Sequence, residues 1–200
     1  MQDMLRQMYT QLDSTLIVQN ITGGVGLIQS ATDTGDSTTT ASQTVLYGDI
    51  IGAASRSATA VRGVTIPDFV VMHPRRWYWM QAGLVSVWPL IGGSVGNSTG
   101  QSVTQNYPAA VSGRLPCGLD VIVDANMPTT GEKLVVGPRS EVHLWEDSGN
   151  PVFIRAEQPQ AAQLGVQLVV YEYAAYTLGR YANAFQSVSG TTLMAAPSGF

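Results

Sequence analysis

Charged residues are scarce in this chain. They make up 12% of its 200 residues, about half of their usual share in a globular protein. The apolar share of 44% is large enough for a buried core, and the length suits one domain or one domain with an elaborated subdomain. Such a surface is short of the charges that keep a monomer soluble and separate. We therefore expect other protein to cover much of it.

Lysine, cysteine and long apolar runs are also nearly missing. Lys133 is the only lysine, and the net charge of −4 leaves no basic stripe for sequence-specific binding of nucleic acid. The single cysteine, Cys117, excludes an internal disulfide and an all-cysteine metal cage, and it favours a cytosolic origin. No apolar run reaches about eighteen residues, and the first residues lack the basic region and apolar core of a signal peptide. We expect neither a membrane span nor an export signal.

The strongest local pattern lies at residues 69–80, which read FVVMHPRRWYWM. Four apolar residues rich in β-formers predict a buried strand. The proline that follows has the fixed φ and the missing N–H that suit the first position of a helix, and we expect this helix to end at Gly83. The unit contains little reactive chemistry, so its large apolar groups indicate a core formed by Phe69, Val71, Trp77 and Met80.

Two further helices are predicted from apolar residues at three- and four-residue spacings. The first covers residues 1–18, and no capping residue precedes it. The second covers residues 46–61, with Thr44 as its cap and Gly63 after its end. The segment between them, residues 29–44, contains almost nothing that could be buried, and it predicts a surface loop.

The second half of the chain predicts short strands. A polar stretch at residues 92–112 comes first, and a loop of this length is usually functional or ordered by a partner. The strands expected after it cover residues 119–123, 134–136, 141–146, 151–155 and 165–176. The last of these has apolar residues on both faces, which predicts a strand that is covered on both sides.

One segment resembles a catalytic motif. Residues 92–96, GGSVG, match the G-x-S-x-G pattern around the nucleophile of α/β-hydrolases, and Asp120 or Asp124 and then His143 follow in the order of that triad. The motif requires a helix directly after Ser94, and the residues that follow are typical of a loop. A serine hydrolase using Ser94 is therefore the outsider among the functions considered, and we predict no catalytic residues.

The two histidines do not predict a metal site. His73 and His143 lie seventy residues apart, and neither has a second histidine at ligand spacing. We interpret His73 as the entry to a helix and His143 as part of a strand. No metal and no cofactor are predicted, and Asp120 and Asp124 are expected to flank a strand instead of forming an acid/base pair.

A resemblance runs through nearly all of the chain. Its carriers are MQDMLRQMYTQLD with ITGGVGLI after it, then IPDFVVMHPRRWYWM, GRLPCGLDVIVDANMP, KLVVGPRSEVHLWED and the final GTTLMAAPSGF. In this order and spacing they are similar to blocks of the major capsid proteins of tailed bacteriophages. That family has the Hong Kong 97 type of fold, which encapsulin shells share.

The resemblance implies an α+β fold with two domains. Residues 1–40 and 151–178 would form a peripheral domain with a spine helix and long antiparallel strands. Residues 41–150 would form an axial domain with a mixed sheet flanked by helices, and residues 179–200 a C-terminal segment of open placement. Members of the family also carry an N-terminal arm and an extended β-hairpin before the spine helix. This sequence shows neither, so we expect a fragment or a reduced relative.

The resemblance also implies a function. It indicates a capsid protein that assembles with itself, as hexamers and pentamers, into an icosahedral head shell around phage DNA in the bacterial host cytoplasm. DNA would be contacted without sequence specificity, and scaffold, protease, portal or decoration proteins are the further candidate partners. An encapsulin-like nanocompartment shell is the alternative. Candidate interface residues are Trp88, Asn97 and Tyr107. Some shells of this type are cross-linked through a lysine on the extended hairpin, which this chain lacks.

Overall fold

The computed structural model describes residues 2–18, 25–33, 42–84, 112–129, 133–146, 152–160 and 165–189. The helices are α1 (Gln2–Ile17), α2 (Leu27–Ser30), α3 (Gln43–Ala60), α4 (Pro74–Leu84) and the 3-10 helix η2 (Arg139–Glu141). The strands are β1 (Thr32–Asp33), β2 (Phe69–Met72), β3 (Ser112–Arg114), β4 (Asp120–Val123), β5 (Leu134–Gly137), β6 (His143–Glu146), β7 (Phe153–Gln160), β8 (Gly165–Tyr171), β9 (Ala174–Thr177) and β10 (Gln186–Val188). The chain is therefore a mixed α+β protein, as predicted.

Six strands form the main sheet, in the order β1-β10-β5-β2-β4-β3. β2 lies inside the sheet, parallel to β4 and antiparallel to β5. All four of its residues are buried, which explains why this strand is apolar without alternation. The sheet also takes in β1 and β10, which come from residues 32–33 and 186–188 and pair with each other.

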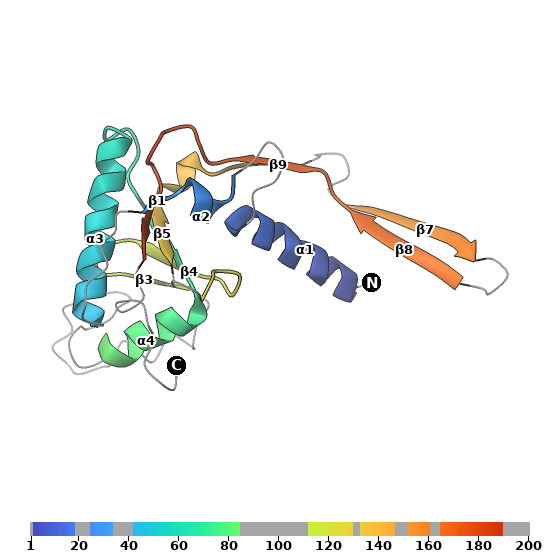
Figure 1. Ribbon diagram of the computed structural model, residues 1–200, viewed down its shortest axis with the longest axis horizontal. Helices are drawn as coiled ribbons and strands as arrows, with labels where there is room; N and C mark the ends of the chain where they lie inside the picture. Colours follow the sequence, from blue (N-terminus) through green and yellow to red (C-terminus); the bar gives the residue numbers. More distant parts are fainter. Residues whose placement is uncertain are drawn as a thin grey trace, which may run out of the picture.

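The two faces of the sheet pack against different elements. Val70 and Met72 of β2 pack in one cluster with side chains of α3 and α4. Phe69 and Val71, which point to the opposite face, pack in a second cluster with the end of α1, with α2 and with the segment before β10. Figure 1 shows α3 along one side of the sheet and α1 with α2 on the other.

The strand and helix predicted around residues 69–83 are confirmed by β2 and α4. Pro74 is the first residue of α4, and the helix ends at Leu84. The expected core residues are all buried, with exposed fractions of 3% for Phe69, 4% for Val71, 1% for Trp77 and 0% for Met80.

Helix α3 confirms the second predicted helix, but its cap differs from the expected one. The helix begins at Gln43 with Ser42 in the N-cap position, so the prediction of Thr44 was wrong. At the other end, the N–H of Gly63 donates to the carbonyl of Ala58, and the N–H of Arg62 donates to the carbonyl of Thr59. This is a Schellman motif, in which Arg62 occupies the left-handed position with a φ of 54°.

The strands of the second half depart from their predicted bounds. Residues 165–176 are not one strand, because the chain turns after Tyr171 and continues as β9. β7 extends past Arg155 to Gln160, and its register with β8 shifts between Glu157 and Gln160. The shift lies next to the proline at 159, which has no backbone N–H to donate to the hydrogen bonds of a regular strand pair. The strand expected from residue 141 begins at His143, because η2 takes up the residues before Val142.

A hairpin projects from the body of the molecule. β7 and β8 pair only with each other, and β6 pairs with β9 in a second two-stranded sheet. Figure 1 shows the β7–β8 hairpin extending beyond the sheet, with α1 beside the connection that leads to it. α1 confirms the helix predicted over residues 1–18, and it packs on β8.

Candidate interaction surface

One face of the projecting hairpin carries a group of apolar residues. In the antiparallel register, Ile154 pairs with Val170 and Ala156 with Leu168. Side chains alternate between the faces of a strand, so these four residues share one face, here called the hairpin apolar face. Ile154 is 48% exposed and Leu168 is 42% exposed. The prediction that this strand is covered on both sides is therefore wrong for the single chain.

Aromatic rings gather where the hairpin joins the rest of the chain. The rings of Phe153 and Tyr171 stack with their centroids 5.1 Å apart, and Tyr173 meets Tyr171 edge-on at 5.7 Å. Tyr173 is nevertheless 67% exposed. Such packing holds the base of the hairpin and leaves a large aromatic surface open to another protein.

Further apolar side chains are exposed on other elements. Leu144 and Trp145 of β6 are 41% and 55% exposed. Along α1, the described residues of the apolar stripe expected from the sequence are only half-buried. The fully buried residue of the helix is Ile17. Scattered exposed apolar groups are normal, but a series that follows three neighbouring elements is typical of an interaction surface.

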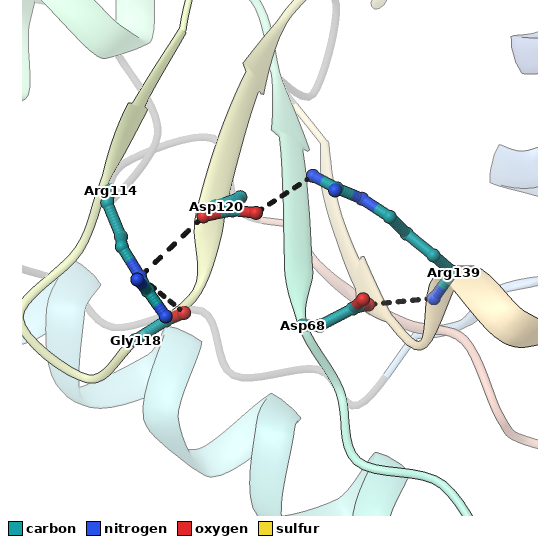
Figure 2. A network of polar contacts seen from close by, with 5 residues as sticks. All are labelled: Asp68, Arg114, Gly118, Asp120 and Arg139. Carbon is teal, nitrogen blue, oxygen red and sulfur yellow. Dashed lines mark hydrogen bonds and ion pairs between the residues drawn. The ribbon is translucent and has the colours of Figure 1, made fainter.

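The carboxylates considered for catalysis have other partners. Figure 2 shows Asp120 at the start of β4, where its carboxylate lies 3.1 Å from the Arg139 guanidinium and 3.7 Å from that of Arg114. The N–H of Arg139 donates to Asp68, so this network ties the ends of β2, β3, β4 and β5 together. Ser94 lies outside the described residues. The geometry gives the described part of the hydrolase triad no support.

The second carboxylate, Asp124, also has a structural partner. It accepts a hydrogen bond of 2.7 Å from the N–H of Asn126 in the turn after β4. Burial and the neighbouring Asp124 carboxyl raise the pKa of Asp13 on α1 from 3.8 to about 6.

A second carboxyl group with a shifted pKa lies after β8. Burial and the nearby Glu146 carboxylate raise the pKa of Glu172.

Both histidines lie where the sequence indicated. The carbonyl of His73 accepts the N–H groups of Arg76 and Trp77, and its Nδ1 accepts the N–H of Arg75, so it caps α4. His143 begins β6, and its ring stacks on Trp145. Within the described ranges, no three histidine, cysteine or carboxylate side chains are grouped as metal ligands.

The residues predicted to form an interface are not among those that the structure describes. Trp88, Asn97 and Tyr107, with the whole of loop 92–112, lie outside the described residues. The sequence did contain a signal for the hairpin, namely apolar residues on both faces of 165–176. We interpreted that pattern as burial within the chain, and the structure leaves one of these faces open. No helix among the described residues is both long and apolar enough to cross a membrane.

The described residues present exposed apolar side chains, and the candidate carboxylates make structural contacts. These two features are typical of a structural protein that binds other protein. A family model described as "Phage capsid protein" matches residues 1–186, and the chain belongs to this family. No curated protein matches the chain. The capsid prediction is confirmed at this level: the protein is a structural virion component of a family that is typically not enzymatic.

Proposed function

We propose that this protein is the major capsid protein of a tailed bacteriophage and that it has the Hong Kong 97 type of fold. Copies of the chain assemble as hexamers and pentamers into the icosahedral head shell that encloses phage DNA. The family match over residues 1–186 is the observation that supports a capsid role most directly. The mixed α+β architecture is compatible with the specific fold.

The proposal assigns the two parts of the molecule to two domains. The main sheet with α3 and α4 corresponds to the axial domain, with residues 41–150 as its continuous part. α1 and the β7–β8 hairpin correspond to the peripheral domain, with α1 as the spine helix. Within the proposed peripheral segment 151–178, β7 and β8 extend away from the main sheet, which suits an element that reaches toward a neighbouring subunit (Figure 1).

The hairpin apolar face is the proposed contact with a neighbouring copy. A two-stranded hairpin is marginally stable in water when nothing packs on it. Leu168 and Ile154 leave much of their apolar area uncovered in the single chain, and covering it stabilises an assembly by about 25 cal/mol for each Å² removed from water. In a closed shell every subunit has neighbouring copies of the same chain, so a second copy is the proposed partner of the hairpin apolar face.

Assembly takes place in the bacterial host cytoplasm under this proposal, and the packaged DNA is contacted without sequence specificity. The net charge of −4 suits a container that must not hold its DNA tightly. Scaffold, protease, portal and decoration proteins are further proposed partners.

The test is assembly of the purified chain. Sedimentation and electron microscopy are expected to show discrete rings or shells. Leu168→Asp places a charge on the hairpin apolar face and is expected to leave only small species. Gln167→Asp is the matched control, because it adds the same charge one residue away on the opposite face of β8.

Two results would contradict the proposal in different ways. A wild-type chain that stays monomeric at every concentration would argue against self-assembly. Shells formed equally well by Leu168→Asp would leave self-assembly intact and remove the hairpin apolar face from the contact.

A further inference from the structure

Asn126 contacts two carboxylates that come from separate parts of the chain. Its side-chain Nδ2 donates to Oδ2 of Asp13 on α1 at 2.6 Å. Its backbone N–H donates to Oδ1 of Asp124, directly after β4, at 2.7 Å. One residue therefore holds an acidic side chain of α1 and an acidic side chain of the sheet at the same place.

The surroundings fix the positions of both carboxylates. The N–H of Asp124 donates to the carbonyl of Met72, which anchors the turn to the end of β2. Met127 closes the same turn and is buried in one cluster with Ile17 at the end of α1. The last turns of α1 also reach β9, where the Tyr176 hydroxyl donates to the carbonyl of Thr15 at 3.4 Å. The contact is thus a defined junction between α1 and the sheet.

The charges around Asp13 are all negative or distant. Asp124 is the charged group that acts on it from the sheet. On α1 itself, the other charged side chains are Asp3 and Arg6, which lie in its first two turns and pair with each other. β8 and α2 pack on α1 and contain no charged residue, and Glu172 directly after β8 faces Glu146. No described cation neutralises the Asp13–Asp124 pair in these contacts.

We propose that Asp13, Asp124 and Asn126 form a proton-operated latch that holds α1 to the sheet when the Asp13 carboxyl carries a proton and loosens when that carboxyl is charged. Asn126 satisfies one oxygen of each group in either state. The proton removes the repulsion between the carboxylates and lets one of them donate to the other. The latch belongs to the single chain and does not rest on the proposed function.

The direction of the pH dependence follows from the raised pKa of Asp13. In the docked state this pKa is about 6, and the ordinary value is 3.8. The extra stability of the docked state is therefore fully present below about pH 4, and it is lost as the pH rises through about 6. Two pKa units correspond to about a hundredfold in an equilibrium constant. Because Asp13 is only partly buried, we expect about a tenfold change after solvent screening.

Hydrogen exchange of the α1 amides in the unassembled full-length chain tests the latch. The measured exchange rates are divided by the intrinsic exchange rate of an unprotected amide at the same pH, which gives the opening constant of α1. The opening constant of α1 in the wild type is expected to be about tenfold larger at about pH 7.5 than at about pH 4. Asp13→Asn keeps an acceptor for Asn126 and removes the charge, so protection at both pH values is expected to equal that of the wild type at the lower pH.

Three further variants make the test specific. Asp124→Asn is expected to flatten the pH dependence in the same way as Asp13→Asn. Asp3→Asn is the matched control on the same helix, where the side chain is 92% exposed, and it is expected to keep the wild-type profile. Glu172→Gln is also expected to keep it. An Asp13→Asn profile that still varies tenfold with pH, or loss of the variation in Asp3→Asn or Glu172→Gln, would overturn the proposal. Shell assembly is a separate measurement, so failure of the latch leaves the capsid proposal untouched.

Discussion

Two strand glycines show how closely the core residues pack. A Cβ added at Gly113 of β3 would lie 2.5 Å from Cζ2 of Trp77, and one added at Gly137 of β5 would clash with the ring of Phe185. Each glycine belongs to the main sheet, and each large ring belongs to the cluster on one of its faces. The rings can approach the backbone only because these positions lack a side chain.

The first residue-scale prediction concerns Trp77. Its side chain is 1% exposed and fills the space over Gly113. Trp77→Ala leaves a cavity, and we expect it to lower the free energy of unfolding by about 3 to 5 kcal/mol in chemical denaturation. Tyr78→Ala is the control on the same helix, because Tyr78 is 37% exposed and is expected to cost clearly less. A loss below about 1 kcal/mol for Trp77→Ala would show that this ring is not central to the core.

The second residue-scale prediction concerns the end of α3. Arg62 has a φ of 54°, a left-handed conformation that side chains with a Cβ adopt at a cost. Arg62→Gly is expected to raise the free energy of unfolding by about 0.5 to 1 kcal/mol, since the exposed arginine contributes little contact area. Arg62→Ala shortens the side chain but keeps the strain, so it is expected to give no gain. Equal stabilisation by both substitutions would refute the backbone explanation.

At the scale of elements, the sequence predicted helices and strands best where the residues of one short segment determine its secondary structure. The apolar run before Pro74 indicated β2 and α4 because burial and a preset φ are properties of that segment alone. The cap of α3 was misplaced by two residues, since both Ser42 and Thr44 are residue types found at N-caps and the pattern alone did not decide between them.

The division of residues 165–176 could not be predicted in the same way. β8 pairs with β7, the strand directly before it, whereas β9 pairs with β6. The second pairing joins strands that are distant in the sequence, so the local pattern does not show where β8 ends. The apolar face that the hairpin exposes has the same sequence pattern as a strand buried inside its own chain. For the candidate surface, the sequence therefore indicated apolar residues on both faces but not that one of these faces is exposed in the single chain.

The hairpin carries the element-scale prediction. In the unassembled chain, the amides of β7 and β8 are expected to exchange faster than those of β2 and β5, because a two-stranded sheet with one open apolar face has little stability of its own. On assembly, hydrogen exchange of the hairpin is expected to slow by at least about tenfold. β2 and β5 serve as the internal control, since they are already buried and should change little. Equal protection of the hairpin before and after assembly would exclude it from the contact.

At the scale of the whole molecule, scarcity of charge and exposure of apolar surface have one explanation. The main sheet buries most of its apolar residues, on both faces, within the chain. α1, the β6–β9 pair and the hairpin leave several of theirs open. A monomer with such a surface would need abundant charge to stay separate, and charged residues make up only 12% of this chain. Family membership explains the combination, because a capsid protein is covered by its own copies.

The last prediction is that this protein forms assemblies without covalent cross-links. A lysine–asparagine cross-link requires an uncharged amine held in a dry site. The ammonium group of Lys133, the only lysine, lies 3.8 Å from the Asp33 carboxylate, and its side chain is 34% exposed. This ion pair uses the charged form of the amine, which is not a nucleophile. Boiling purified assemblies in detergent and reductant is expected to release a single band near 21.3 kDa. A ladder of multiples that is present in the wild type and disappears in Lys133→Ala would contradict this prediction. Asp33→Asn tests the ion pair. A ladder found only in that variant would show that Asp33 keeps the amine unreactive.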